Sequence, residues 1–73
     1  MKFWVFNDID GTSIVKSKEK PVIGLTHWEG PFGSLREAKN NALEYHRATK
    51  TTANNAIAAV KALRSRDIEK IED

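Results

Sequence analysis

Residues 34–37, Ser34-Leu35-Arg36-Glu37 (SLRE), mark the point where the sequence changes from turn-rich to helical. A serine followed three residues later by a glutamate is the pattern of a capping box. In it the serine side chain accepts a hydrogen bond from the Glu37 backbone N–H, and the Glu37 carboxylate accepts one from the Ser34 N–H. The pattern predicts that a helix begins within a residue or two of Ser34.

The 40 residues that follow Gly33 contain no glycine and no proline. Small and apolar residues recur among them every three or four positions, the spacing of one helical face. They are Leu35, Ala38, Ala42, Tyr45, Thr49, Ala53, Ala56, Val60 and Leu63. Residues 49–52 form helix least readily, because three of the four are β-branched threonines. We expect one long, bent helix or a helical hairpin broken there, and favour the long helix because the spacing continues in phase.

The first 33 residues hold all four glycines and both prolines. Aromatic or β-branched runs at 2–6, 12–15 and 22–28 are expected as strands, the first two joined by a turn at Asp10-Gly11. The predicted fold class is α+β, with a three-stranded antiparallel sheet followed by a long C-terminal helix or helical hairpin. The chain is short enough to form a single domain, 1–73, with a β-rich part at 1–33 and a helical part at 34–71.

Self-association is predicted from the lengths of these elements. A sheet of three short strands spans about 17 Å, whereas about 36 residues of continuous helix reach about 54 Å. Much of an alanine-lined helix would extend beyond its own sheet. There is no cysteine, and the two histidines are too few for a typical zinc site. A second copy of the chain is then the expected cover, and we predict a homodimer.

Residues 8–12, Asp8-Ile9-Asp10-Gly11-Thr12, resemble motif one of the haloacid dehalogenase-like phosphatases. The resemblance implies Asp8 as nucleophile, Asp10 as general acid/base and Mg²⁺ as cofactor. That chemistry also needs a parallel α/β sheet and further metal-binding carboxylates. No strand-like segment follows residue 33, so we interpret the motif as a hairpin turn. We predict no catalytic residue, no cofactor, no metal site and no enzymatic activity.

Residues 28–38, WEGPFGSLREA, together with Ala42 and Tyr45, resemble the strand-to-helix junction of AP2-type and integrase N-terminal DNA-binding domains. The resemblance implies three antiparallel strands before a helix, with the sheet entering the major groove of DNA. Trp4 and Lys16 are the nearest equivalents of the side chains that such a sheet presents to the bases.

Positive charge is concentrated in the second half of the chain. Residues 1–33 are neutral overall, whereas residues 36–66 hold seven basic and two acidic side chains, a net charge of +5. On a straight helix a subset of these cations falls within about 80° of arc, and we expect it to contact phosphates with Lys16 assisting. The predicted nucleic-acid-binding residues are Arg36, Lys39, Arg47, Lys50, Lys61 and Lys16. The alternative is a solvated surface without a ligand.

The aromatic residues Trp4, Phe6 and Trp28 indicate a second function. The strand at 2–6 is apolar on both faces, so one aromatic pair is expected to face outward and bind another protein. The alternative prediction is therefore a protein–protein interaction module, an inhibitor or adaptor. No apolar run approaches the roughly 20 residues of a membrane span and no signal-peptide pattern begins the sequence, so we expect no membrane partner and a cytoplasmic location.

Overall fold

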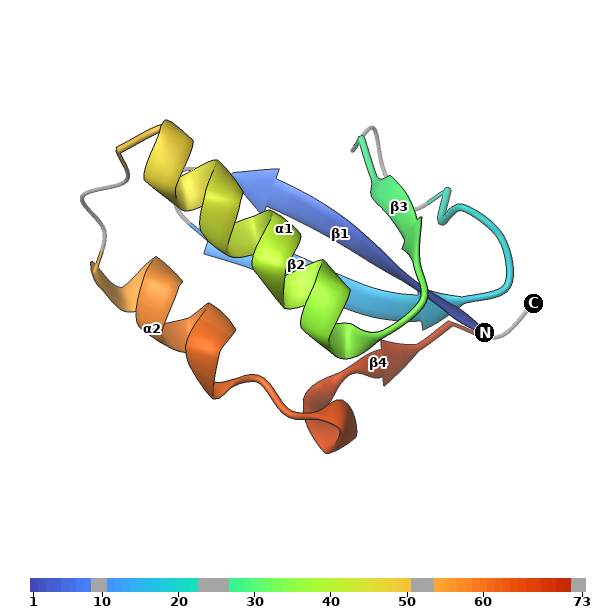
Figure 1. Cartoon of the computed structure of the whole chain (residues 1–73). Helices are drawn as coiled ribbons and strands as arrows, with labels where there is room; N and C mark the ends of the chain where they lie inside the picture. The colour runs from blue at the N-terminus through green and yellow to red at the C-terminus, as the bar shows by residue number, and fades with distance from the viewer. Residues whose placement is uncertain (9–10, 23–26, 51–53, 72–73) are drawn as a thin grey trace.

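The computed structural model describes residues 1–8, 11–22, 27–50 and 54–71. Two helices lie side by side on one face of a four-stranded sheet (Figure 1). In chain order the elements are β1 (Lys2–Asp8), β2 (Gly11–Ser17), β3 (Glu29–Phe32), α1 (Leu35–Ala48), α2 (Asn54–Ala62), the short 3₁₀ helix η1 (Ser65–Asp67) and β4 (Glu69–Lys70). The predicted α+β class is confirmed.

The strand order is β3-β1-β2-β4. β1 pairs antiparallel with β2, as predicted, and also with β3, a pairing for which no partner was predicted from the sequence. β4 was not predicted: it pairs parallel with β2, joining Val15 to Glu69 and Lys16 to Lys70. The helical part was predicted to continue to residue 71, and that prediction is wrong for residues 68–70, because Ile68 enters the core and carries Glu69 and Lys70 to the edge of the sheet.

The β1–β2 hairpin confirms the structural interpretation of the Asp8–Thr12 motif. Asp8 pairs with Gly11, which leaves a connection of residues 9 and 10. Gly11 therefore belongs to β2 rather than to the turn, and Asp10 lies outside the described residues.

The third strand begins later than the sequence predicted. Residues 23–26 lie outside the described part of the chain, and Val22 is not in a strand. β3 instead starts at Glu29, one residue after the end of the predicted strand. Gly30 makes this path possible: its φ is +138°, and a Cβ built on it would lie 2.9 Å from the Phe3 carbonyl oxygen. Only glycine allows the two backbones to come so close.

The start of α1 was predicted correctly, and its end was not. Ser34 Oγ accepts from the Glu37 N–H at 3.2 Å, while the Glu37 carboxylate accepts from Gly33 N–H, one residue earlier than expected. The favoured long helix is wrong, and the helical hairpin is correct. Thr49 ends α1, its hydroxyl donating to the Tyr45 carbonyl at 2.9 Å, and Lys50 follows in the left-handed region with φ 52°. The turn therefore needs neither glycine nor proline.

The alanine face packs against the chain's own sheet. Ala38 and Ala42 from α1 are fully buried with Val5, Ile14 and residues of α2. Because α1 ends at Ala48 and α2 is a separate helix, the described residues contain no single long helix that extends beyond the sheet. The reason for expecting a homodimer is thereby removed, and self-association is left as an untested prediction. Within the described ranges, no helix is both long and apolar enough to cross a membrane.

Replacing Gly30 with alanine should destabilise the fold by about 2–3 kcal/mol, because the new Cβ meets backbone at a φ that L residues avoid. Gly11→Ala is the matched control, since a Cβ there meets nothing within 4 Å. It should leave the free energy of unfolding unchanged or raise it by up to about 1 kcal/mol. Urea denaturation followed by circular dichroism measures both, and equal values for the two variants would contradict this account of β3.

Candidate functional site

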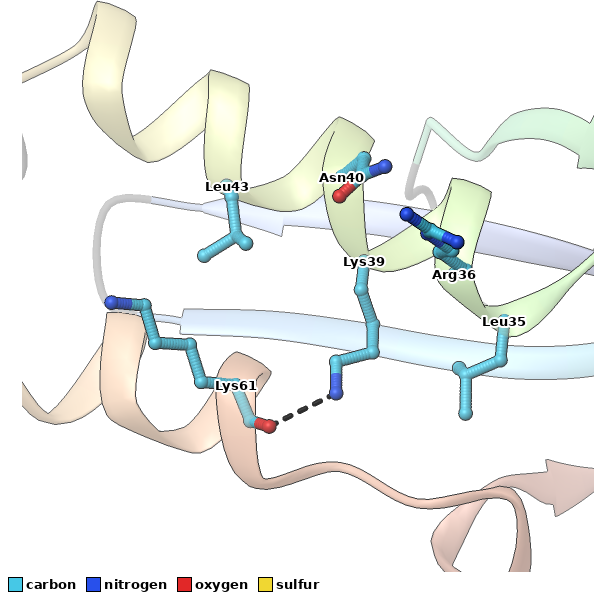
Figure 2. A pocket seen from close by; sticks show the side chains of 6 residues that line it. All are labelled: Leu35, Arg36, Lys39, Asn40, Leu43 and Lys61. Carbon is cyan, nitrogen blue, oxygen red and sulfur yellow. Dashed lines mark hydrogen bonds between the residues drawn. The ribbon is translucent and has the colours of Figure 1, made fainter.

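A continuous groove runs between α1 and α2. Its first pocket has a volume of about 400 Å³ and is lined by Leu35, Arg36, Lys39, Asn40, Leu43 and Lys61 (Figure 2). Its second pocket, of about 330 Å³, is lined by Leu43, His46, Arg47, Lys50, Ile57 and Lys61. The two pockets share Leu43 and Lys61, so we treat them as one feature, the inter-helix groove.

Five of the six predicted nucleic-acid-binding residues line this groove, namely Arg36, Lys39, Arg47, Lys50 and Lys61. None of the described residues that line it is acidic. On one long helix these cations would share a single ridge. In the structure Lys61 faces the other four across the groove, because it belongs to α2.

The position of each lining residue on α1 follows from helical periodicity. Positions 36, 40, 43 and 47 are spaced by three or four residues and form one stripe along α1, and Lys50 follows just beyond the end of the helix. Leu43 lies at the centre of that stripe and is half-buried, with the basic residues toward its ends. The groove therefore has an apolar centre, completed by Ile57 of α2, and cationic rims.

Lys39 differs from the other cations because its ammonium is already engaged. Figure 2 shows its side chain crossing from α1 to α2, where Nζ donates to the Lys61 carbonyl and to the Leu63 carbonyl, each at 2.9 Å. These carbonyls lie at the C-terminal end of α2, where backbone acceptors lack helical partners and a cation is favoured. Lys39 thus acts as a clamp between the helices.

The Lys61 side chain extends away from Lys39 toward the Leu43 side of the groove (Figure 2). Arg36 and Asn40 stay on the α1 rim, while Leu35, Lys39 and Leu43 point toward α2. Lys61 lines both pockets.

Lys16, the sixth predicted residue, does not join this site. It lies on β2, half-buried, with its Nζ 5.2 Å from the centre of the Phe3 ring. A cation at this distance over an aromatic ring is attracted by the ring's negative face. Lys16 is not among the residues that line the groove.

The predicted partner-binding aromatics form a second core on the sheet face opposite the helices. Trp4 and Trp28 are only 8% and 6% exposed and pack with Val15. The expected exposure of these two tryptophans is therefore wrong, because Trp28 itself folds over the sheet and covers this face. Phe6 is half-buried, with its ring 6.1 Å from that of Trp28. The burial of Trp4 also removes it from the base-reading position that the DNA-binding resemblance implied.

A chain of polar side chains, missed by the sequence analysis, fixes α1 against the sheet. Asn41 donates to Glu29 and accepts from Asn7, at 3.0 Å each. The Thr12 hydroxyl donates to Asn7 at 3.0 Å and lies 2.8 Å from His46 Nε2. These residues are far apart in the sequence, so only the sheet register and the helix position together reveal the chain.

His46 ends this chain beneath the second pocket and is 1% exposed. The Thr12 hydroxyl has one proton, and where it donates that proton to Asn7 its bond to His46 is accepted from Nε2–H. The burial of His46 on the sheet side of α1 gives the second pocket a rigid wall.

No protein-family model, curated protein or solved structure matches this chain. Among the described residues there is also no group of three or more metal-ligating side chains. The groove with its cationic rims is the feature that the structure offers for a ligand.

Replacement of Lys39 should destabilise the fold more than replacement of Lys61. Lys39→Met removes two charge-assisted hydrogen bonds and should lower the free energy of unfolding by about 1–2 kcal/mol. Lys61→Met removes an equal charge but leaves the Lys61 carbonyl in place, so its effect should stay within about 0.5 kcal/mol. Thermal and urea denaturation test both variants. Equal destabilisation would show that Lys39 is not a clamp.

Proposed function

We propose that this protein is a non-catalytic accessory or regulatory protein that binds nucleic acid in the inter-helix groove, through phosphates. The observation that supports the proposal is the convergence of Arg36, Arg47, Lys50 and Lys61 on one groove whose described lining has no acidic residue. None of these four side chains forms an ion pair within the described part of the chain. Lys39 is left out of the binding set because its ammonium is engaged.

A phosphodiester strand matches the two kinds of surface in the groove. Arginine and lysine on the rims pair with phosphate oxygens. Leu43 and Ile57 offer apolar contacts to the deoxyribose carbons between successive phosphates. At about 1.5 Å per residue, the 14 residues of α1 extend about 21 Å, long enough to follow several phosphates of one strand.

The lining also indicates how the nucleic acid is recognised. None of the described lining residues is Phe, Tyr or Trp, the side chains on which unpaired bases stack. Contacts to phosphate and sugar position a protein on a duplex without reading its sequence. We therefore propose binding to duplex DNA with little sequence preference.

Salt dependence is the direct test. Four cations that neutralise four phosphates give a slope of log K against log salt of about −3.6, so affinity should fall about 100-fold between 50 and 200 mM salt. Arg36→Gln and Lys61→Gln should each reduce the magnitude of the slope by about 1. Fluorescence anisotropy of a labelled random duplex measures these values.

Lys39→Gln provides the internal control, because it removes the same charge from a residue that does not contact phosphate in this proposal. The slope of log K against log salt for this variant should equal that of the unmodified protein at a temperature where both are folded. A slope near zero, or equal slopes for all four proteins, would refute nucleic-acid binding through the groove.

The apolar centre of the groove favours a second candidate, a protein partner. An apolar centre with a charged rim is the pattern of grooves that bind amphipathic helices, and here the cations require an acidic partner. This candidate replaces the aromatic surface expected from the sequence. It predicts no retention of duplex DNA and a bound protein that is lost on Leu43→Gln, but not on Phe6→Gln.

A further inference from the structure

Each pocket is lined by three lysine or arginine residues, but the second holds more of them that no interhelical hydrogen bond engages. Arg47 and Lys50 reach it from the end of α1, and Lys61 reaches it from α2. The first pocket contains Arg36 and Lys61 as its available cations, since Lys39 is engaged in the clamp. Three available cations in about 330 Å³ make a compact anion site at the lower end of the size range of ligand pockets.

The end of a helix normally repels anions, because its last carbonyls carry partial negative charge. Here several of those carbonyls are occupied. The Tyr45 carbonyl accepts from both the N–H and the hydroxyl of Thr49, and the Arg47 carbonyl accepts from Lys50 N–H. These bonds reduce the opposing field at the pocket.

The chain turns at the end of α1. Thr49 caps the helix, and Lys50, which follows in the left-handed region, lines the second pocket. The antiparallel return then brings Ile57, the fourth residue of α2, to the opposite wall. From α2, Ile57 and Lys61 line the pocket.

His46 holds the wall of the pocket in place. Its ring is buried and bonded through Nε2 to Thr12, and that hydroxyl is in turn bonded to Asn7. The residue that follows it, Arg47, is thereby fixed at its backbone while its long side chain stays exposed. A cation on a rigid base loses less freedom when it binds an anion.

We propose that this pocket is a phosphate subsite, in which Arg47, Lys50 and Lys61 together hold one phosphate group. The inference rests on the proposed function and deepens it, because the phosphate belongs to a nucleic-acid strand that continues along the groove toward Arg36. Arginine supplies a bidentate fork and the two lysines supply point charges, a combination suited to phosphate oxygens.

Inorganic phosphate is the first probe. In ¹H–¹⁵N NMR titrations at constant ionic strength, replacing chloride with phosphate should shift the amides of Arg47, Lys50 and Ile57 in a saturable manner. The double variant Arg47→Gln/Lys50→Gln should weaken phosphate affinity at least tenfold. The control Lys18→Gln/Lys20→Gln removes the same charge from exposed positions that do not line the groove, and should change the affinity less than twofold.

Short duplexes with and without a 5′-phosphate identify the source of the phosphate. Tighter binding of the phosphorylated duplex assigns the pocket to a strand end, and equal binding assigns it to a backbone phosphate. In either case the pocket variant should lose more affinity than Arg36→Gln.

The subsite proposal is overturned if phosphate shifts these amides no more than chloride does, or if the two double variants bind phosphate equally. Saturable phosphate binding without binding of either duplex would keep the subsite and reject the nucleic-acid function. Duplex binding without a phosphate response would keep the nucleic-acid function and reject the subsite.

Discussion

Close packing of small helical residues on the sheet is the constraint on which the rest of the structure depends. Ala38 and Ala42 are fully buried, and a methyl group is all that separates their turns of α1 from the strands. Helices that come this close leave little room for larger side chains between helix and sheet. Leu43 directly follows Ala42, and Leu35 lies three residues before Ala38; both line the gap between α1 and α2 and are only half-buried.

The inter-helix groove follows from this arrangement, and its charge is a cost to stability. Like charges brought together oppose the compact state. Lys39 offsets part of this repulsion by joining α1 to the end of α2. The remaining cations have no such structural task among the described residues, and clustered charge without a structural task is typical of a ligand site.

Local signals in the sequence predicted the local features. The capping box at Ser34 gave the helix start, and the Asp8–Thr12 motif gave the hairpin, because both depend on residues a few positions apart. The grouping of the five groove cations was also predicted, although on one helix rather than across two.

Features that depend on distant contacts were missed. The left-handed Lys50 is an unusual conformation for lysine, and it becomes favourable only when α2 has a sheet to pack on. β4 is two residues long and exists through its pairing with β2. The clamp role of Lys39 requires the end of α2 to be in place, and the burial of Trp4 requires Trp28 to cover the second face. No sequence window contains both partners of these contacts.

The helical hairpin is the central claim, and one distance tests it. The chain has no cysteine, so spin labels on Arg36→Cys/Lys61→Cys occupy unique positions. Both residues line the first pocket, and packed helices lie about 8–10 Å apart, so electron spin resonance should give a separation within about 20 Å. A continuous helix would separate the two positions by about 37 Å. A distance near that value would contradict the hairpin, the groove and the function proposed for it.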